Sequence, residues 1–568
     1  MKKYPQKKLK LHSLGLRGIL NFKLTMNLLE FIDNESGTSK SQIISMALLS
    51  GFANGLLLAI INFASDLVSN HELQLGYFFI YLMAFGLYVY TQKYAFSQAT
   101  MTVESIIHKM RLRITDKLRR TELRFIENSK RGEIYIRLTQ DSNLISQSAL
   151  TLLSAGQSAM VLFFALLYLS WLSPMSFLIT ALFLGMAIFF YLSHHQHLAQ
   201  QLHTATQNEA AFFETLNHIL EGFKEIKVNR EQSDALFNQL ETLSQKTKNL
   251  KVNVGNQQVA DLMFARTSFY FLLAILIFII PFFHVTHAED IYKIAATILF
   301  ILGPMTFIVT TLPILSRTRV ALENLYALEV ELEANLLKTD KKPALLSAPV
   351  PISEFQMIRF EEVIFHYQNN NQQSLFSLGP INLTLKKGEI LFIAGDNGSG
   401  KSTFLKLLVG LYYPSTGDLY WNNEIIEPAN YASYRELFSI MFSDFFMFNK
   451  LSGLSTIDEQ TLNQQLRLLE LEQNTQYQDG VLTHFHLSHG QKKRLAFLAT
   501  VMKNKPIYIF DELALAHDPL LRKYFYEVVL KEFKKQGKTI IAVVHDDKYF
   551  DMADRVLQIE NGKLMVNG

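Results

Sequence analysis

Apolar residues are distributed differently in the two parts of the chain. Before about residue 320 they gather in long uninterrupted runs, and after about residue 355 they alternate with polar residues. A membrane-spanning helix needs about 20 consecutive apolar residues, whereas a soluble α/β domain needs the mixed pattern. The pattern therefore predicts a helical membrane region followed by a soluble α/β domain.

The apolar runs predict six spanning helices, at 41–66, 75–96, 150–172, 175–193, 267–284 and 291–315. The first contains Asn54, Asn62 and Asp66, so we expect part of it to face protein or water. A soluble helix bundle would explain any one of these runs, but not six in series.

Lys and Arg residues indicate the orientation of these helices. They are concentrated before the first span and in the two connections that follow the second and fourth spans, whereas the other three loops, at 69–72, 173–176 and 285–290, contain none. Because cytoplasmic loops carry the excess of positive charge, both termini are predicted to be cytoplasmic. We therefore expect a multi-pass protein of the bacterial inner (plasma) membrane.

Composition narrows the possible functions. The chain has 568 residues, too many for one hydrophobic core, and a net charge of +3 that gives no indication of a nucleic-acid partner. Cys is absent, which excludes disulfides, zinc–thiolate sites and thiol nucleophiles. The Pro-containing stretch KTDKKPALLSAPVP is the natural linker. The predicted divisions are a cytoplasmic N-terminal segment (1–40), the transmembrane domain (41–330), a linker (331–355) and a nucleotide-binding domain (356–568).

The strongest motif is GDNGSGKS, at 395–402, which follows the apolar run ILFIAG and precedes a helical pattern. This is the order of a phosphate-binding loop: strand, Gly-rich turn, helix. Glycines let backbone N–H groups approach phosphate oxygens, and the helix N-terminus adds favourable partial charge. Lys401 would contact the β- and γ-phosphates of ATP, and the Ser402 hydroxyl would bind Mg²⁺. The expected nucleotide-binding residues here are Gly395, Asn397, Gly398, Gly400, Lys401, Ser402 and Thr403.

A second motif, PIYIFDE, ends an apolar strand in two carboxylates. Ligands bind at the carboxyl ends of parallel strands, so this pair would lie near the phosphate loop. Asp511 would hold Mg²⁺, and Glu512 would be the catalytic base that orients the attacking water.

Between these motifs, LSHGQ at 487–491 opens a basic amphipathic helix. LSxGQ resembles the signature motif of ABC ATPases, and with the two motifs above it identifies the chain as a member of that family. Six spans, two long cytoplasmic connections and a C-terminal ATPase resemble an exporter-type half-transporter. The resemblance implies an α-helical six-span transmembrane domain followed by an α/β P-loop ABC ATPase domain.

The resemblance also implies roles for individual residues. Ser488, Gly490 and Gln491 would face the γ-phosphate of ATP held by the partner subunit, and Asp518 matches the loop that contacts the partner. His545 matches the switch histidine at the γ-phosphate, and Tyr367 the aromatic residue that stacks on adenine. The segments FIENSKRGEIYIRLTQD and LEGFKEIKVNREQ resemble the two coupling segments that rest on ATPase domains.

Three departures from the family pattern indicate a branch. Ser443 stands where a Mg²⁺-linked Gln is usual, His489 where Gly is commonest, and LALAHDP follows the catalytic Glu. Together they resemble exporters of cyclic peptides and peptide siderophores, of the syringomycin, pyoverdine and lasso-peptide exporter type. The expected function is ATP-driven export of such a compound by a homodimer, with Lys401, Glu512 and His545 as catalytic residues. Two alternatives stay open: an exporter-shaped importer of metal–siderophore complexes, and a membrane-anchored regulatory ATPase.

Overall fold

The structure is a computed structural model of the full chain. It describes residues 40–69, 75–129, 131–279, 288–336, 355–368, 374–428, 430–448, 459–478, 481–484, 487–511 and 519–567. The chain divides into two compact units: Met1–Arg119 with Ser129–Ala334, and Arg120–Asn128 with Asn335–Gly568.

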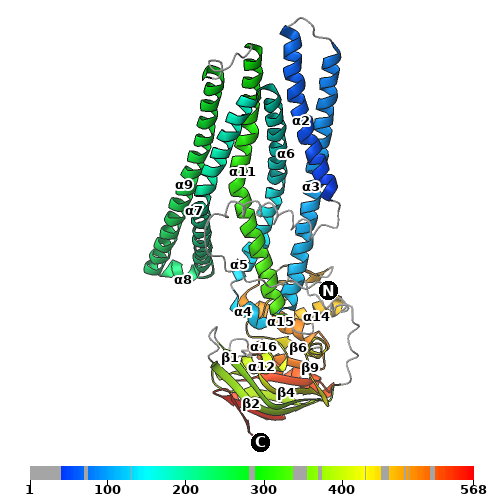
Figure 1. The fold of residues 1–568 in the computed structure, drawn as a ribbon. Helices are drawn as coiled ribbons and strands as arrows, with labels where there is room; N and C mark the ends of the chain where they lie inside the picture. The colour runs from blue at the N-terminus through cyan, green and yellow to red at the C-terminus, as the bar shows by residue number, and fades with distance from the viewer. Residues whose placement is uncertain are drawn as a thin grey trace. The chain divides into compact units, whose positions relative to one another are not determined.

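Long helices build the first unit (Figure 1). They are α2 (Lys40–Ser69), α3 (Leu75–Arg120), α6 (Ser142–Leu172), α7 (Pro174–Glu221), α9 (Arg230–Ala274), which continues into the π-helical turn η3 (Ile275–Ile279), and α11 (Ala288–Ala334). Shorter elements connect them: α5 (Arg131–Ile136) and η2 (Arg137–Asp141) before α6, and α8 (Phe223–Val228) between α7 and α9. At about 1.5 Å per residue, the 46 residues of α3 extend well beyond a hydrocarbon layer about 30 Å thick.

Five helices in the described part of the chain are long and apolar enough to cross a membrane. They contain Ser45–Ala64, Leu75–Arg120, Gly132–Leu172, Arg230–Ile279 and Ile291–Ala334, and α7 adds a shorter apolar stretch, Pro174–Phe189. Each predicted span falls on one of these six helices, although 280–284 of the fifth lie outside the described residues. The predicted helical membrane fold is confirmed.

Helix α2 approaches α6 closely because small residues line the contact. A Cβ atom added to Gly51 would lie 2.6 Å from the Cβ atom of Met160, and one added to Gly55 would lie 3.0 Å from that of Phe164. This Gly-x-x-x-Gly spacing is a common device for helix packing in membranes. Beside it, the buried Gln157 side chain donates from Nε2 to Ser50 Oγ at 3.2 Å.

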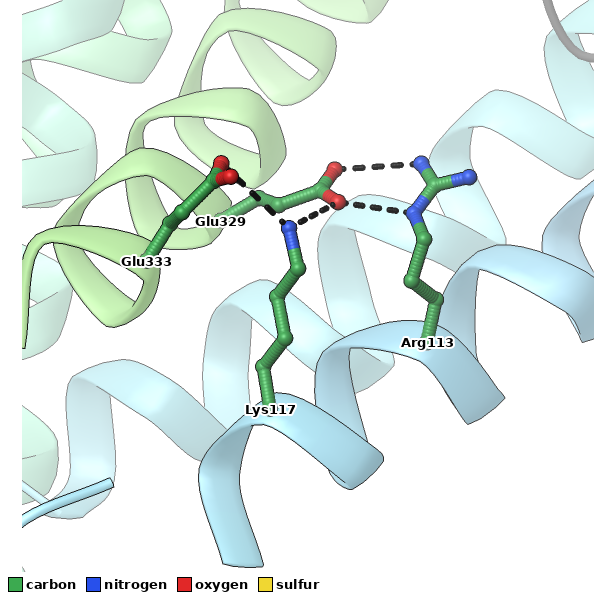
Figure 2. A network of polar contacts seen from close by, with 4 residues as sticks. All are labelled: Arg113, Lys117, Glu329 and Glu333. Atoms are coloured by element: carbon green, nitrogen blue, oxygen red, sulfur yellow. Dashed lines mark hydrogen bonds and ion pairs between the residues drawn. The ribbon is translucent and has the colours of Figure 1, made fainter. Parts of the chain in front are cut away.

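Near its C-terminal end, α11 is tied to α3 by charged side chains (Figure 2). Glu329, whose side chain is 11% exposed, accepts from Arg113 Nε at 2.7 Å and from Lys117 Nζ at 2.7 Å. Arg113 Nη2 donates to the second oxygen of Glu329 at 3.0 Å. Lys117 also lies 3.6 Å from the exposed carboxylate of Glu333. The buried Glu329 is thus satisfied by two cations from one face of α3.

Strands and short helices form the second unit. A six-stranded sheet has the order β12 (Lys563–Asn567), β11 (Arg555–Glu560), β3 (Ile390–Ala394), β10 (Thr539–Val543), β9 (Ile507–Phe510), β6 (Phe438–Met441). A four-stranded antiparallel sheet has the order β2 (Ser374–Lys386), β1 (Met357–Gln368), β4 (Thr416–Trp421), β5 (Glu424–Ile425), and β7 (Tyr477–Gln478) pairs with β8 (Val481–Leu482). The helices are α12 (Lys401–Leu408), α13 (Tyr431–Arg435), α14 (Glu459–Leu468), α15 (His489–Val501), α16 (Pro519–Tyr524) with η5 (Phe525–Val529) and α17 (Leu530–Lys535), and η6 (Asp547–Met552).

The six-stranded sheet is buried on both faces, which explains the nearly continuous apolar runs of its strands. Along β3, Leu391 and Ile393 belong to one hydrophobic cluster, whereas Ile390 and Phe392 belong to another. Successive side chains therefore enter opposite cores, as the period of a strand requires. All five residues of β3 and of β10 are buried.

A segment that lies more than 200 positions earlier in the sequence, Arg120–Asn128, also belongs to this second unit. Helix α4 (Leu123–Asn128) packs Leu123 against the cluster that contains Ile393. Just before it, Thr121 forms an isolated antiparallel bridge with Leu336. Residues 120–128 are thus joined by contacts to the unit that contains the strands.

Candidate functional site

Strand register brings the predicted motifs to one edge of the six-stranded sheet. Strand β10 runs parallel to β3 and β9, with Ala542 paired to Phe392 on one side and to Phe510 on the other. On the far side of β9, Met441 of β6 pairs in parallel with Phe510. The segments that follow these strands therefore leave the sheet at the same level. The phosphate loop follows β3, His545 follows β10, Asp511 follows β9 and Ser443 follows β6.

The phosphate loop is held in a conformation that its glycines permit. Gly395 has a φ of 143°, and a Cβ atom there would lie 2.3 Å from the Ile559 carbonyl oxygen. Gly398 and Gly400 also have positive φ angles, of 79° and 112°. Lys401, which begins α12, is 5% exposed, and its Nζ donates to the carbonyl oxygens of Gly395 and Asp396, both at 2.8 Å. These two hydrogen bonds hold the Lys401 ammonium against the phosphate loop.

A cavity of about 310 Å³ opens beside this loop. Its lining combines loop and helix residues with two aromatic side chains: Tyr367, Phe376, Asn397, Gly398, Gly400, Lys401, Ser402 and Thr403. Tyr367 of β1 thus lies beside the phosphate loop. Its contact with the base of a nucleotide stays a prediction. Phe376 was not predicted, since no motif marks it.

The carboxylate expected to hold Mg²⁺ lies at the end of β9. Asp511 is 2% exposed, and its backbone N–H donates to the Met441 carbonyl at 2.8 Å. The Ser443 hydroxyl donates to Asp511 Oδ2 at 3.3 Å. Carboxylate and hydroxyl oxygens are the hard ligands that Mg²⁺ prefers, so this pair, with Ser402, fits the ion. The predicted base Glu512 and the predicted partner contact Asp518 lie outside the described residues.

Ser488 begins α15 and closes a capping box. Its Oγ accepts from the Gln491 backbone N–H at 3.3 Å, and its own N–H donates to Gln491 Oε1 at 2.8 Å. Both bonds use acceptor atoms of the two side chains, which leaves the Ser488 hydroxyl proton and the Gln491 amide protons as available donors. Ser488 and Gly490 are exposed. This exposed helix start therefore has the polarity that a phosphate requires.

Residues 378–514 match the family described as ABC transporter, and residues 42–308 match the family described as ABC transporter transmembrane region. The chain belongs to the ABC transporter family. In such a protein the ATPase domain hydrolyses ATP to drive transport across the membrane, so this ABC transporter is an ATP-driven, multi-span membrane transporter.

Of two relatives of this ABC transporter, one matches most of the chain and the other matches about a third of it. The chain is 29% identical over 480 residues to ATP-binding protein SyrD of Pseudomonas syringae pv. syringae. This match covers 80% of this chain and 82% of the relative. It is 30% identical over 226 residues to energy-coupling factor transporter ATP-binding protein EcfA1 of Fusobacterium nucleatum, covering 37% of this chain and 82% of the relative. A solved structure of a bacterial Atm1-family ABC exporter with ATP bound has a TM-score of 0.72, with 15% identity, covering 96% of this chain and 95% of that one.

The structure of this ABC transporter also shows polar residues that sequence reasoning missed. The hydroxyl of Tyr367 lies 2.5 Å from that of Tyr412, which in turn donates to Glu127 of α4 at 2.5 Å. Lys406 of α12 pairs with the same carboxylate at 2.8 Å. The sequence contains no signal for these contacts, because Glu127 is separated from Lys406 by 279 positions.

Proposed function

We propose that this transporter is a homodimeric exporter of a cyclic or otherwise compact peptide natural product or peptide siderophore. The observation that carries the proposal is the sheet edge at which the phosphate loop, Asp511, Ser443 and His545 converge, on a chain that also contains the membrane helices. The branch resemblance supports the substrate class, because Ser443, His489 and the LALAHDP segment occur together. The apolar spans, rich in Phe and Tyr, suit an amphipathic molecule better than a small ion, which needs fixed charges or carbonyls.

Each residue of the ATP site has a task that its position supports. Lys401 would exchange its two carbonyl contacts for phosphate oxygens, and backbone N–H groups of residues 397–403 would surround the phosphates. Ser402 and Asp511 would hold Mg²⁺, directly or through water, with Ser443 in place of the usual Gln. When bound, this ion neutralises charge on the phosphates. Glu512 would orient the attacking water, and His545 would contact the γ-phosphate.

Two copies of the chain would complete two such sites. The Ser488 hydroxyl and the Gln491 amide of one protomer would donate to the γ-phosphate held by Lys401 of the other. ATP would then favour the closed dimer, because it contacts both protomers only in that arrangement. The coupling segments, at 125–141 and 220–232, would transmit closure to the membrane helices.

The homodimer is tested by mixing two inactive variants. Chains with Lys401→Ala and chains with Ser488→Arg are each expected to be inactive, because every site in either homodimer lacks one half. A mixed dimer would retain one intact site and recover about half of the ATPase activity per dimer. If purified mixed dimers recover none, the head-to-tail arrangement is wrong.

Direction is tested with vesicles. We expect ATP to drive a candidate cyclic peptide or peptide siderophore into inside-out vesicles, since the ATPase domain and both termini would be cytoplasmic. ATP added outside right-side-out vesicles is the matched control and should have no effect. Uptake only into right-side-out vesicles with ATP trapped inside would instead establish the importer of metal–siderophore complexes.

A further inference from the structure

A chain of polar contacts connects the cavity aromatic Tyr367 to α4 within the second unit. Tyr367 and Tyr412 hold their hydroxyl oxygens 2.5 Å apart, and Tyr412 lies 2.5 Å from Glu127 Oε2. Tyr412 is 2% exposed, and its ring stacks on Phe365 with centroids 4.8 Å apart and an interplanar angle of 6°. The Tyr412 ring is therefore held firmly, and its hydroxyl is the only polar atom that it can offer to both neighbours.

The donors in this chain have one consistent direction. A carboxylate can only accept, so the single hydroxyl proton of Tyr412 goes to Glu127. The contact with Tyr367 must then use the Tyr367 proton, which Tyr367 donates to the oxygen of Tyr412. Tyr367 thus donates to Tyr412, and Tyr412 donates to Glu127 of α4. The direction of both hydrogen bonds depends on the Glu127 carboxylate, which can only accept.

A cation fixes that carboxylate. Lys406 Nζ lies 2.8 Å from Glu127 Oε1 and 5.3 Å from the centre of the Tyr412 ring. Burial alone would lower the pKa of Lys406, but the hydrogen bond and charge of Glu127 outweigh it and raise the pKa. Burial also raises the pKa of Tyr412, and Glu127 raises it further, so the phenol stays protonated. Because Lys406 lies on α12, which begins at Lys401, the same helix touches both the cavity and the carboxylate.

We propose that Tyr412 is a positioning residue that orients Tyr367 for the nucleotide base and links this orientation to Glu127 of the α4 segment. The proposal rests on the proposed function, in which Tyr367 stacks on adenine. It follows that displacement of α4 changes affinity for ATP through the base and not through the phosphates. By thermodynamic reciprocity, a bound base stabilises the position of α4.

The test compares ATP with inorganic tripolyphosphate, which has the phosphates but no base. Dissociation constants of both, with Mg²⁺, are measured on the full-length transporter in lipid nanodiscs. Tyr412→Phe keeps the stacked ring and removes the hydroxyl, so we expect ATP to bind about threefold to tenfold more weakly, the effect of one lost hydrogen bond. Binding of tripolyphosphate should stay within about twofold of wild type. Tyr413→Phe is the matched control, because the Tyr413 hydroxyl accepts from Arg435 at 2.7 Å instead.

Two further variants separate the possible failures. Tyr367→Ala should weaken ATP binding about fivefold or more through lost stacking, again without changing tripolyphosphate binding. If Tyr367→Ala does not weaken ATP binding selectively, the contact of Tyr367 with the base is wrong, and the proposed link through Tyr412 is wrong as well. If Tyr367→Ala is selective for ATP but Tyr412→Phe weakens both ligands equally, or neither, only the positioning role is overturned.

Glu127→Ala tests the other end of this series of hydrogen bonds and keeps both tyrosine side chains in place. It removes the acceptor that sets the direction of the hydroxyl donors, so it should also weaken ATP binding selectively. Combined with Tyr412→Phe it should add little, because both changes break the same path. Full additivity of the two losses would contradict a link through Tyr412.

Discussion

Replacing Glu329 with Gln should destabilise the helical unit. The substitution keeps the size of the side chain but removes the negative charge that faces Arg113 and Lys117 at 2.7 Å each. It leaves two cations that point at a neutral amide, which can accept through only one oxygen. The contact between α3 and α11 near their C-terminal ends would lose its charge-assisted hydrogen bonds.

The magnitude follows from burial. Breaking a fully buried ion pair from one side costs about 3–5 kcal/mol. Here the Glu329 side chain is 11% exposed, but those of Lys117 and Arg113 are 20% and 35% exposed, so water can solvate the abandoned cations. We therefore expect a loss of about 1–3 kcal/mol, since exposed pairs contribute only about 0–1 kcal/mol.

The matched control is Glu333→Gln. Its carboxylate is 62% exposed and lies 3.6 Å from Lys117, so its loss should cost about 0.5 kcal/mol or less. Thermal unfolding of both variants in nanodiscs gives the comparison, with the midpoint of Glu329→Gln lower by several degrees and that of Glu333→Gln nearly unchanged. Equal midpoints for the two variants would refute the reasoning, because burial of the carboxylate would then contribute nothing.

Three other changes test the packing and the ATP site. Gly51→Ala should lower the midpoint of thermal unfolding, because its Cβ atom would lie 2.6 Å from that of Met160. Gly86→Ala is the control and should leave the midpoint unchanged, because its Cβ atom would meet no neighbouring atom within 4 Å. Equal effects of the two substitutions would contradict close helix packing at Gly51. Glu512→Gln should preserve ATP binding and abolish hydrolysis, as measured by nucleotide binding and phosphate release, and near-normal turnover would remove Glu512 as the base. Ser443→Ala should raise the Mg²⁺ concentration needed for half-maximal ATPase activity several-fold if Ser443 supports the ion, and an unchanged requirement would exclude it.

The strands that hold the ATP site could be predicted because each has a recognisable pattern in its own short stretch of sequence. An apolar run ends in a Gly-rich turn at Gly395 and in a carboxylate at Asp511, and the fold class of parallel strands then implies that these ends meet. The structure adds the register, in which Ala542 lies between Phe392 and Phe510. The spans could be predicted for a similar reason, since about 20 apolar residues in a row have few other solutions.

Long-range polar contacts could not be predicted in this way. Glu329 and its cation Arg113 are 216 positions apart, and each one alone looks like an ordinary charged residue on a helix. Tyr412 carries no motif either; only the structure places its hydroxyl between Tyr367 and Glu127. Likewise, Gly51 and Gly55 signal close packing only when α6 is known to be their neighbour.

The nine residues from Arg120 to Asn128 belong by contact to a unit whose other residues begin at Asn335. A gene fusion that exchanged ATPase domains between two transporters at the linker would leave Glu127 with the donor of the membrane helices and Lys406 with the other parent. Such a hybrid would inherit an unmatched carboxylate or an unmatched amine, even with every nucleotide-binding motif intact. Exchange of this domain in evolution or engineering therefore keeps the contact only with a second crossover around residues 120–128, or with compensating changes at Lys406 and Tyr412.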